Sequence, residues 1–272
     1  MDARPIGVFD SGVGGLTVLH ECLVTMPHED FVYLGDHARL PYGPRPRDEV
    51  RRFAQEIGLY LEGLGVKMIV VACNTATSVA LPDLQEQLGV PVVSVIVPEA
   101  HAAVQATRNR RIGLLATELT VASRRYELLV HALDAGVQMT AVACAKLVPL
   151  IESGDTFSED VLEAVREYAA PLKQTGCDTV ILGCTHYPLL RPVFQRTFGR
   201  DVTLIFSADE TAREVSETLA RKGFENDHAR EGTYRFLTTG DPELFRALGE
   251  RFLQLPVASV GRVAVSELEA AA

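Results

Sequence analysis

Short apolar runs rich in β-branched residues alternate along this chain with longer segments of helical period, and this alternation constrains the fold more than any other feature. The runs are continuously apolar, which is typical of parallel strands covered by helices on both faces. We expect strands at residues 5–9, 31–34, 66–72, 90–95, 111–116, 137–143, 178–183, 202–206 and 233–238. We expect helices near residues 14–26, 47–63, 76–88, 121–134, 159–174, 209–221 and 242–252. The sequence therefore predicts an α/β fold built on parallel sheets.

A weak internal repeat relates the first part of the chain to the middle. RPIGVFDS (4–11) is similar to RRIGLLAT (110–117), and IVVACNTAT (69–77) is similar to VILGCTHYP (180–188). Local similarity of this kind is also common among unrelated α/β sequences, so it does not establish a repeat by itself. The matching positions of two cysteines favour a true structural repeat.

The repeat predicts two pseudo-symmetric parallel-sheet α/β domains with the active site between them. The first domain would comprise residues 1–97 plus 207–272, because the last strand and its helices would return to it. The second would comprise residues 98–206, with the boundary near Pro98.

Composition narrows the function classes. The 272 residues carry a net charge of −10, which argues against a nucleic-acid surface. No apolar run approaches the roughly 20 residues that span a bilayer, and the start MDARPIGVFD lacks the pattern of a signal peptide. The five cysteines are odd in number and form no CxxC pair, so we expect neither a disulfide framework nor a metal site. We therefore expect a cytoplasmic protein that binds neither nucleic acid nor membrane.

The stretch DSGVGGL (10–16) follows the first expected strand and opens a helix. Glycines at such a turn allow backbone N–H groups to approach an anion at the helix N-terminus. Thr17 stands where a dinucleotide fingerprint needs glycine, so an anion site, a tight turn and a dinucleotide site all stay open, in that order. Asp10 and Ser11 lie at the carboxyl end of a strand, where ligands bind in parallel sheets, although either could simply cap the helix.

Two further segments also leave strands at that edge. LGDHARLPYGPR (34–45) turns through Pro41, and Tyr42 and Gly43 could contact a ligand there or form only a rigid loop. Glu152, in LVPLIESG, is an acid after an apolar run and would be read as an ordinary exposed glutamate without other information.

Cys73 and Cys184 occupy the same local setting, each at the end of a strand and the start of a helix. Each could be a buried, inert thiol, as is common for cysteine. A helix N-terminus, however, stabilises a thiolate. Asn74 and Thr75 follow the first thiol, and Thr185 and His186 follow the second. A matched pair is more consistent with chemistry than with two independent burials.

Two equivalent thiols suit inversion of a stereocentre by proton transfer. One face of the substrate needs a base and the other an acid, and the two groups exchange roles in the reverse direction. One must be thiolate while the other is thiol, so they titrate as a coupled pair. Asp10 and Glu152 would then act as hydrogen-bonding partners or proton relays, since a nearby carboxylate disfavours a thiolate.

The sequence resembles the cofactor-independent glutamate racemases of the aspartate/glutamate racemase superfamily. The matching pieces appear in the same order over most of the first 200 residues: GVFDSGVGGLTVL, YLGDHARLPYGPR, VVACNTAT, LVPLIESG and LGCTHYPLL. The resemblance implies interconversion of L- and D-glutamate without a cofactor, supply of D-glutamate for peptidoglycan, two α/β domains and commonly a homodimer.

The resemblance also implies roles for individual residues. Catalytic roles fall on Cys73, Cys184, Asp10, Glu152 and His186. Substrate contacts fall on Asp10, Ser11, Tyr42, Gly43, Asn74, Thr75, Thr185 and His186. One departure concerns Leu119, which stands where the family often has glycine, so neither Thr117 nor Thr120 is included among the expected contacts.

Three other functions stay open. The first is a racemase for aspartate or another acidic amino acid, although related aspartate racemases tend to carry Glu where this chain has His186. The second is a related decarboxylase, which would need only one thiol, so the presence of both thiols argues against it. The third is a binding protein for acidic amino acids that has lost catalysis. A bound ligand would then stabilise the protein against heat, and no racemisation would occur.

Overall fold

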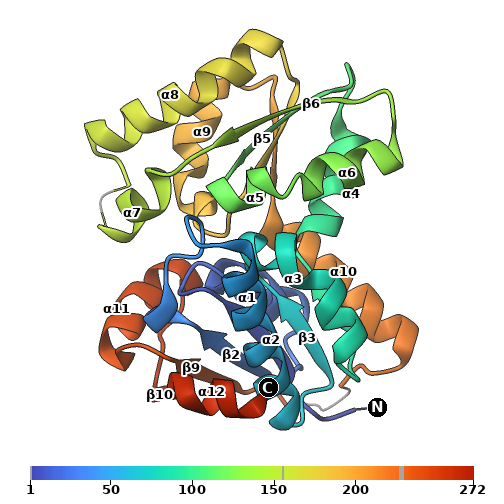
Figure 1. The fold of residues 1–272 in the computed structure, drawn as a ribbon, viewed down its shortest axis with the longest axis vertical. Coiled ribbons are helices and arrows are strands. Elements are labelled where there is room, and N and C mark those ends of the chain that lie inside the picture. Colours follow the sequence, from blue (N-terminus) through green and yellow to red (C-terminus); the bar gives the residue numbers. More distant parts are fainter. Residues whose placement is uncertain (1, 155, 227–229) are drawn as a thin grey trace.

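The computed structural model describes residues 2–154, 156–226 and 230–272, and within them ten strands form two parallel sheets (Figure 1). The first sheet has the order β10-β9-β2-β1-β3-β4 and the second the order β6-β5-β7-β8. The strands are β1 (Ile6–Asp10), β2 (Phe31–Gly35), β3 (Met68–Val71), β4 (Val92–Ser94), β5 (Arg111–Ala116), β6 (Gln138–Ala143), β7 (Thr179–Gly183), β8 (Thr203–Phe206), β9 (Tyr234–Thr238) and β10 (Val260–Arg262). The predicted fold class, α/β with two parallel sheets, is confirmed.

Helices pack around both sheets. They are α1 (Leu16–Thr25), α2 (Arg47–Gly63), α3 (Asn74–Gln87), α4 (Ile96–Ala106), α5 (Glu118–Ala122), α6 (Arg125–Leu133), α7 (Leu147–Glu152), α8 (Glu159–Thr175), α9 (Arg191–Phe198), α10 (Ser207–Lys222), α11 (Pro242–Leu253) and α12 (Val265–Ala271), with short 3₁₀ helices η1 (His37–Arg39) and η2 (Tyr187–Leu190). In the described part of the chain, no helix is both long and apolar enough to cross a bilayer.

Both faces of the first sheet are buried, as continuous apolar strands require. Along β1, Ile6 and Val8 point into one hydrophobic cluster and Phe9 into another, because successive side chains of a strand face opposite sides. Helix α1 packs against α10 and α11 over the first cluster, and α2 packs against α3 and α12 over the second.

The two sheets share the same internal order. Strand β1 lies between β2 and β3, with β4 beyond β3, and β5 lies between β6 and β7, with β8 beyond β7. Cys73 follows β3 and Cys184 follows β7, so the two thiols occupy equivalent places in the two sheets. Strands β9 and β10 extend the first sheet beyond β2.

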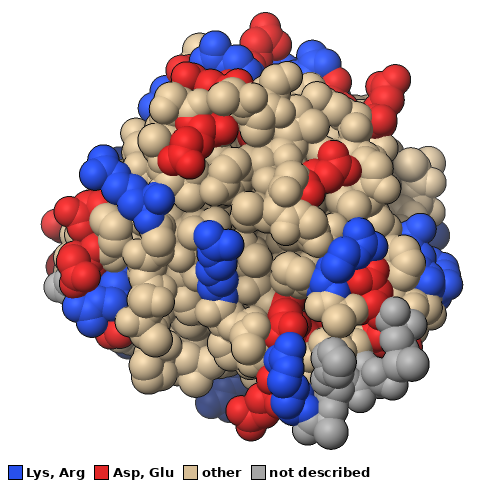
Figure 2. All heavy atoms as spheres, turned by 90° about the horizontal axis from the view of Figure 1, so that it is seen from below, with Lys and Arg blue, Asp and Glu red and all other residues tan. Residues whose placement is uncertain are grey.

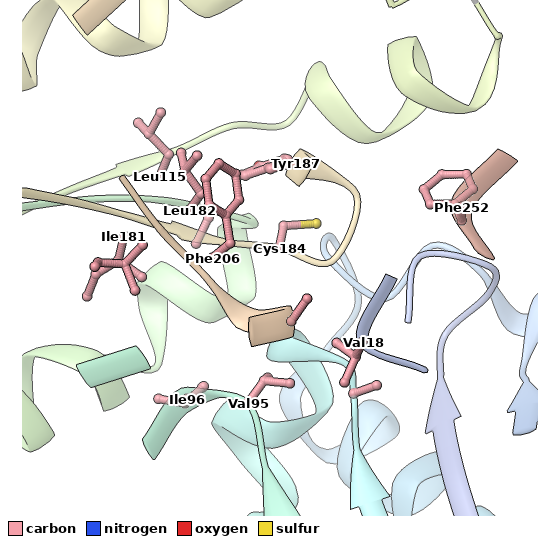
Figure 3. Close-up of a cluster of buried hydrophobic side chains, with 14 of the residues drawn as sticks. Val18, Val95, Ile96, Leu115, Ile181, Leu182, Cys184, Tyr187, Phe206 and Phe252 are labelled. Atoms are coloured by element: carbon pink, nitrogen blue, oxygen red, sulfur yellow. The ribbon is translucent and has the colours of Figure 1, made fainter. Parts of the chain in front are cut away.

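One hydrophobic cluster runs from the first sheet to the second (Figure 3). Val18 and Ile96 belong to it on one side, and Leu182 and Phe206 on the other. Helix α4 contacts α10 as well as β7 and β8, so it joins the two lobes seen in Figure 1. The predicted domain boundaries near residues 98 and 207 stay a prediction.

The expected helix over 121–134 is two helices, α5 and α6, because Arg124 adopts a left-handed backbone conformation with φ 54°. Helices α4, α7, α9 and α12 and strand β10 were not expected from the sequence. On the face shown in Figure 2, acidic and basic side chains are interspersed.

Candidate active site

A cavity of about 300 Å³ lies between the two sheets, and the loops that follow their strands line it. Ten of the eleven residues that the sequence predicts for the site line this cavity: Asp10, Ser11, Tyr42, Gly43, Cys73, Asn74, Thr75, Cys184, Thr185 and His186. The eleventh, Glu152, contacts His186 from outside the lining. The strand-end positions explain the assembly, since the carboxyl ends of parallel strands meet at one edge of each sheet.

Cys73 caps the N-terminus of α3. Its sulfur accepts a hydrogen bond from the N–H of Ala76 at 3.5 Å and lies 3.9 Å from the hydroxyl oxygen of Ser11. Burial, followed by the negative charge of Asp10, raises the pKa of the Cys73 thiol well above its usual range. Burial and Asp10 therefore both favour the protonated thiol of Cys73.

Asp10 is fully buried at the end of β1. One carboxylate oxygen, Oδ2, accepts hydrogen bonds from the backbone N–H of Gly15 at 2.9 Å and of Gly12 at 3.4 Å. The other oxygen, Oδ1, is buried and has no hydrogen-bond partner among the described residues. Asp10 thus organises the glycine turn with one oxygen and retains a free acceptor beside the cavity.

Cys184, His186 and Glu152 form a chain of contacts on the opposite side of the cavity. The sulfur of Cys184 lies 3.8 Å from Nδ1 of His186, and Nε2 of His186 lies 2.9 Å from Oε1 of Glu152. Burial lowers the pKa of His186, but its hydrogen bonds with Cys184 and Glu152 outweigh burial and raise it to about 10. The raised pKa favours the charged imidazole near neutral pH, and a positive charge beside a sulfur favours its thiolate form.

The glycine turn of the first half packs directly against this imidazole. A Cβ atom at Gly14 would lie 2.4 Å from Nδ1 of His186 and 2.5 Å from the hydroxyl oxygen of Thr185, so only glycine fits there. The hydroxyl of Thr17 donates to the carbonyl of Thr185 at 3.0 Å. Phe252 closes the other side of His186, with its ring edge-on at 5.2 Å between centroids.

Tyr42 contributes its ring to the cavity wall, but its hydroxyl is used inside the protein. That hydroxyl donates to Oδ2 of the buried Asp36, which also accepts from Nε of Arg39 at 2.7 Å. The loop that carries Tyr42 and Gly43 is therefore held from behind by an ion pair. The carbonyl of Gly43 accepts a hydrogen bond from the N–H of Leu119 at 3.1 Å, which ties this loop to the second half.

Thr117, Glu118 and Cys144 also line the cavity, and sequence reasoning did not select them. Thr117 was excluded because of Leu119, yet its hydroxyl is hydrogen-bonded to that of Thr75 at 2.8 Å. The internal repeat could have predicted Thr117 as a site residue, because Thr117 in RRIGLLAT aligns with Ser11 in RPIGVFDS. Cys144 is buried and borders the cavity.

The cavity favours a small ligand whose negative charge is held by dipoles. None of the described residues that line it is lysine or arginine. The 14-residue helix α3 begins at Asn74, and the positive end of its dipole favours an anion there. The charged imidazole of His186 adds positive potential on the other side.

Comparison with known proteins gives a consistent result. The family model described as Asp/Glu/Hydantoin racemase matches residues 17–215. The chain is 46% identical over 257 residues to a glutamate racemase of Carnobacterium sp. (strain St2), covering 94% of this chain and 96% of the relative. It is 46% identical over 260 residues to a glutamate racemase of Bacillus cereus, covering 96% and 97%.

Solved structures agree with these relatives. The glutamate racemase isoform RacE1 from Bacillus anthracis superimposes with a TM-score of 0.94 at 41% identity, covering 97% of this chain and 99% of that one. A glutamate racemase from Francisella tularensis, crystallised in complex with D-glutamate, gives a TM-score of 0.92 at 32% identity, with the same coverage.

Proposed function

Because this chain belongs to the Asp/Glu/hydantoin racemase family, and matches glutamate racemases over nearly its whole length, we propose that it interconverts L- and D-glutamate. The resemblance of its motifs to those enzymes extends the proposal to a cytoplasmic homodimer that supplies D-glutamate for peptidoglycan. Residues 1–97 plus 207–272 and residues 98–206 form its two proposed domains, a division supported by the membership of the two sheets.

One observation carries the proposed mechanism: two thiols from equivalent positions of two sheets line a single small cavity. A substrate between them presents one face of its Cα to each sulfur. One sulfur removes the Cα proton, and the other delivers a proton to the opposite face. The C–H electron pair stays on carbon in between, and the two sulfurs exchange protonation states in each turnover.

The two sulfurs have unlike neighbours. Cys73 lies beside the carboxylate of Asp10, which disfavours its thiolate, whereas Cys184 lies beside the imidazole of His186, whose raised pKa favours the charged form. Glu152 accepts from His186 and orients its ring, and the free oxygen of Asp10 can accept or relay a proton on the other side.

Recognition of an acidic amino acid would use neutral donors. Ser11, Thr75 and Thr185 bring hydroxyl groups to the cavity, and α3 brings backbone N–H groups. Inside a cavity such donors bind a carboxylate more strongly than at the protein surface, because fewer water molecules compete with them.

The deciding experiment incubates the protein with L-glutamate in D₂O without added cofactor. Circular dichroism follows loss of optical activity, and NMR follows loss of the Cα proton signal. We expect both signals to decay, because proton transfer at Cα exchanges the hydrogen with solvent. Retention of both by folded protein that binds glutamate would refute the proposal. The same assay with aspartate gives the ratio of kcat/KM values that defines the substrate.

Serine variants test the two-thiol mechanism. Cys73→Ser and Cys184→Ser should each lose most racemisation, because serine has a far higher pKa than cysteine and each change removes the group for one face. Cys177→Ser is the matched control, since Cys177 lies at the opposite end of β7, outside the cavity, and bonds to the carbonyl of Leu172. Wild-type kcat in either Cys73→Ser or Cys184→Ser would show that this thiol is not a catalytic base.

A further inference from the structure

A buried carboxyl group lies behind the residue that follows Cys73. Glu99, on helix α4, is completely buried, and its Oε2 accepts a hydrogen bond from Nδ2 of Asn74 at 2.9 Å. The hydroxyl of Tyr126, on α6, donates to the same carboxyl oxygen and accepts from Nδ2 of Asn74 at 2.8 Å. Three polar side chains from α3, α4 and α6 thus meet where the two lobes join.

This arrangement uses both hydrogens of the Asn74 amide nitrogen. One is donated to Glu99 and the other to Tyr126, so the nitrogen has no donor left for a ligand. The amide oxygen, Oδ1, is buried and has no hydrogen-bond partner among the described residues. Asn74 lines the cavity, so this acceptor is available to a bound molecule.

A free, oriented amide oxygen suits one part of an amino-acid substrate. The α-ammonium group is a pure donor, and the α- and side-chain carboxylates are pure acceptors. An amide that could rotate by half a turn would present N–H groups to the ammonium and lose the contact.

Packing alone does not explain the cluster. One oxygen of Glu99, Oε1, is buried without a hydrogen-bond partner among the described residues, an arrangement that costs free energy and that an apolar side chain would avoid. Burial raises the pKa of Glu99 to about 8, although the hydrogen bonds from Tyr126 and Asn74 act in the opposite direction.

We propose that Glu99 and Tyr126 are positioning residues that lock the Asn74 amide with its oxygen facing the substrate's ammonium group. This inference rests on the proposed racemisation of glutamate. It assigns to α4, which joins the two lobes, an indirect part in substrate recognition, through Asn74.

The first test separates KM from kcat. Glu99→Met removes the acceptor at similar volume and should raise KM for L-glutamate by about tenfold, the effect of one misplaced hydrogen bond, with kcat within about threefold of wild type. Glu99→Gln keeps an acceptor oxygen for both donors and should retain a KM within about threefold of wild type. Tyr126→Phe, which removes only a hydroxyl, should also raise KM. It replaces Glu99→Met in this test if that variant does not fold.

The second test is non-additivity. Asn74→Ala removes the amide, so adding Glu99→Met to it should raise KM no further, whereas a general structural role would add its full effect in both backgrounds. An unchanged KM in both Glu99→Met and Tyr126→Phe, or additive effects on KM, would overturn the inference. The Kd for glutamate is also measured by calorimetry for each variant. If the unsubstituted protein does not racemise glutamate, the proposed function fails, and the same comparison of Kd values still decides the inference.

Discussion

Gly14→Ala should disable the site without touching either thiol. The added Cβ would lie 2.4 Å from Nδ1 of His186, whereas ordinary contacts begin near 3.4 Å, so the imidazole must shift by about 1 Å. It cannot shift freely, because Glu152 holds its far nitrogen at 2.9 Å and the ring of Phe252 packs against it. The 3.8 Å contact between His186 and Cys184 is therefore disrupted.

The size of the effect follows from positioning. A misplacement of about 1 Å can cost roughly 10²-fold in rate, which corresponds to about 2.7 kcal/mol in the activation barrier. Overpacking of this kind also costs about 1–3 kcal/mol of folding stability, so the melting temperature should fall by several degrees. Gly14→Ala should therefore remain folded at 25 °C while kcat drops by about two orders of magnitude.

The assay is racemisation of L-glutamate followed by circular dichroism, with thermal unfolding measured on the same samples. Gly12→Ala is the matched control, because its Cβ would meet no described atom closer than 3.4 Å, from the side chain of Leu40. It should keep activity close to wild type. The reasoning is refuted if Gly14→Ala is folded and retains kcat within about threefold of wild type.

Two further predictions concern buried charges. Lys67→Met should lower the free energy of unfolding by about 3–5 kcal/mol, because it leaves the buried carboxylate of Glu29, 2.5 Å from the ammonium, without its cationic partner. KM should not change, because this pair lies at the end of the sheet opposite the cavity. Thermal unfolding checks the first result and steady-state kinetics the second. The raised pKa of Glu99, about 8 against an ordinary 4.5, means that the folded state binds a proton more tightly than the unfolded state, so its contribution to stability is complete below pH 4.5 and declines up to pH 8. Glu99→Gln should remove this decline, so between those pH values its free energy of unfolding, measured by denaturant titration, should rise by a few kcal/mol relative to wild type. If the free energies of unfolding of wild type and variant change with pH in parallel, the burial argument is contradicted.

Strands β1 to β9 could be predicted because they are short, mostly apolar runs with polar or glycine residues at their ends. β10, with three residues that are exposed or half-buried, carries no such signal. Helix α4 was missed because Pro98 was read as a boundary, yet proline is tolerated in the first turn of a helix. These misses reflect local patterns that tertiary packing overrides.

The site residues that follow directly after strands could be predicted from the sequence. Cys73 and Cys184 reach one cavity because a parallel sheet gathers the residues after its strands at one edge. Glu99 and Tyr126 could not be found in this way, because they lie within helices and meet Asn74 only through packing of α4 and α6. The hydrogen bond from the Tyr42 hydroxyl to Asp36 could not be predicted either, because it depends on the path of a loop.

The unlike surroundings of the two sulfurs have a thermodynamic consequence. L- and D-glutamate are mirror images with the same free energy in water, so their equilibrium constant is one. A reversible catalyst must then have equal kcat/KM for both enantiomers, even though Asp10 accompanies one sulfur and His186 the other. The asymmetry can give the enantiomers different kcat and different KM values, but their ratios must agree. Any substitution on one side of the cavity therefore changes catalytic efficiency for both enantiomers by the same factor.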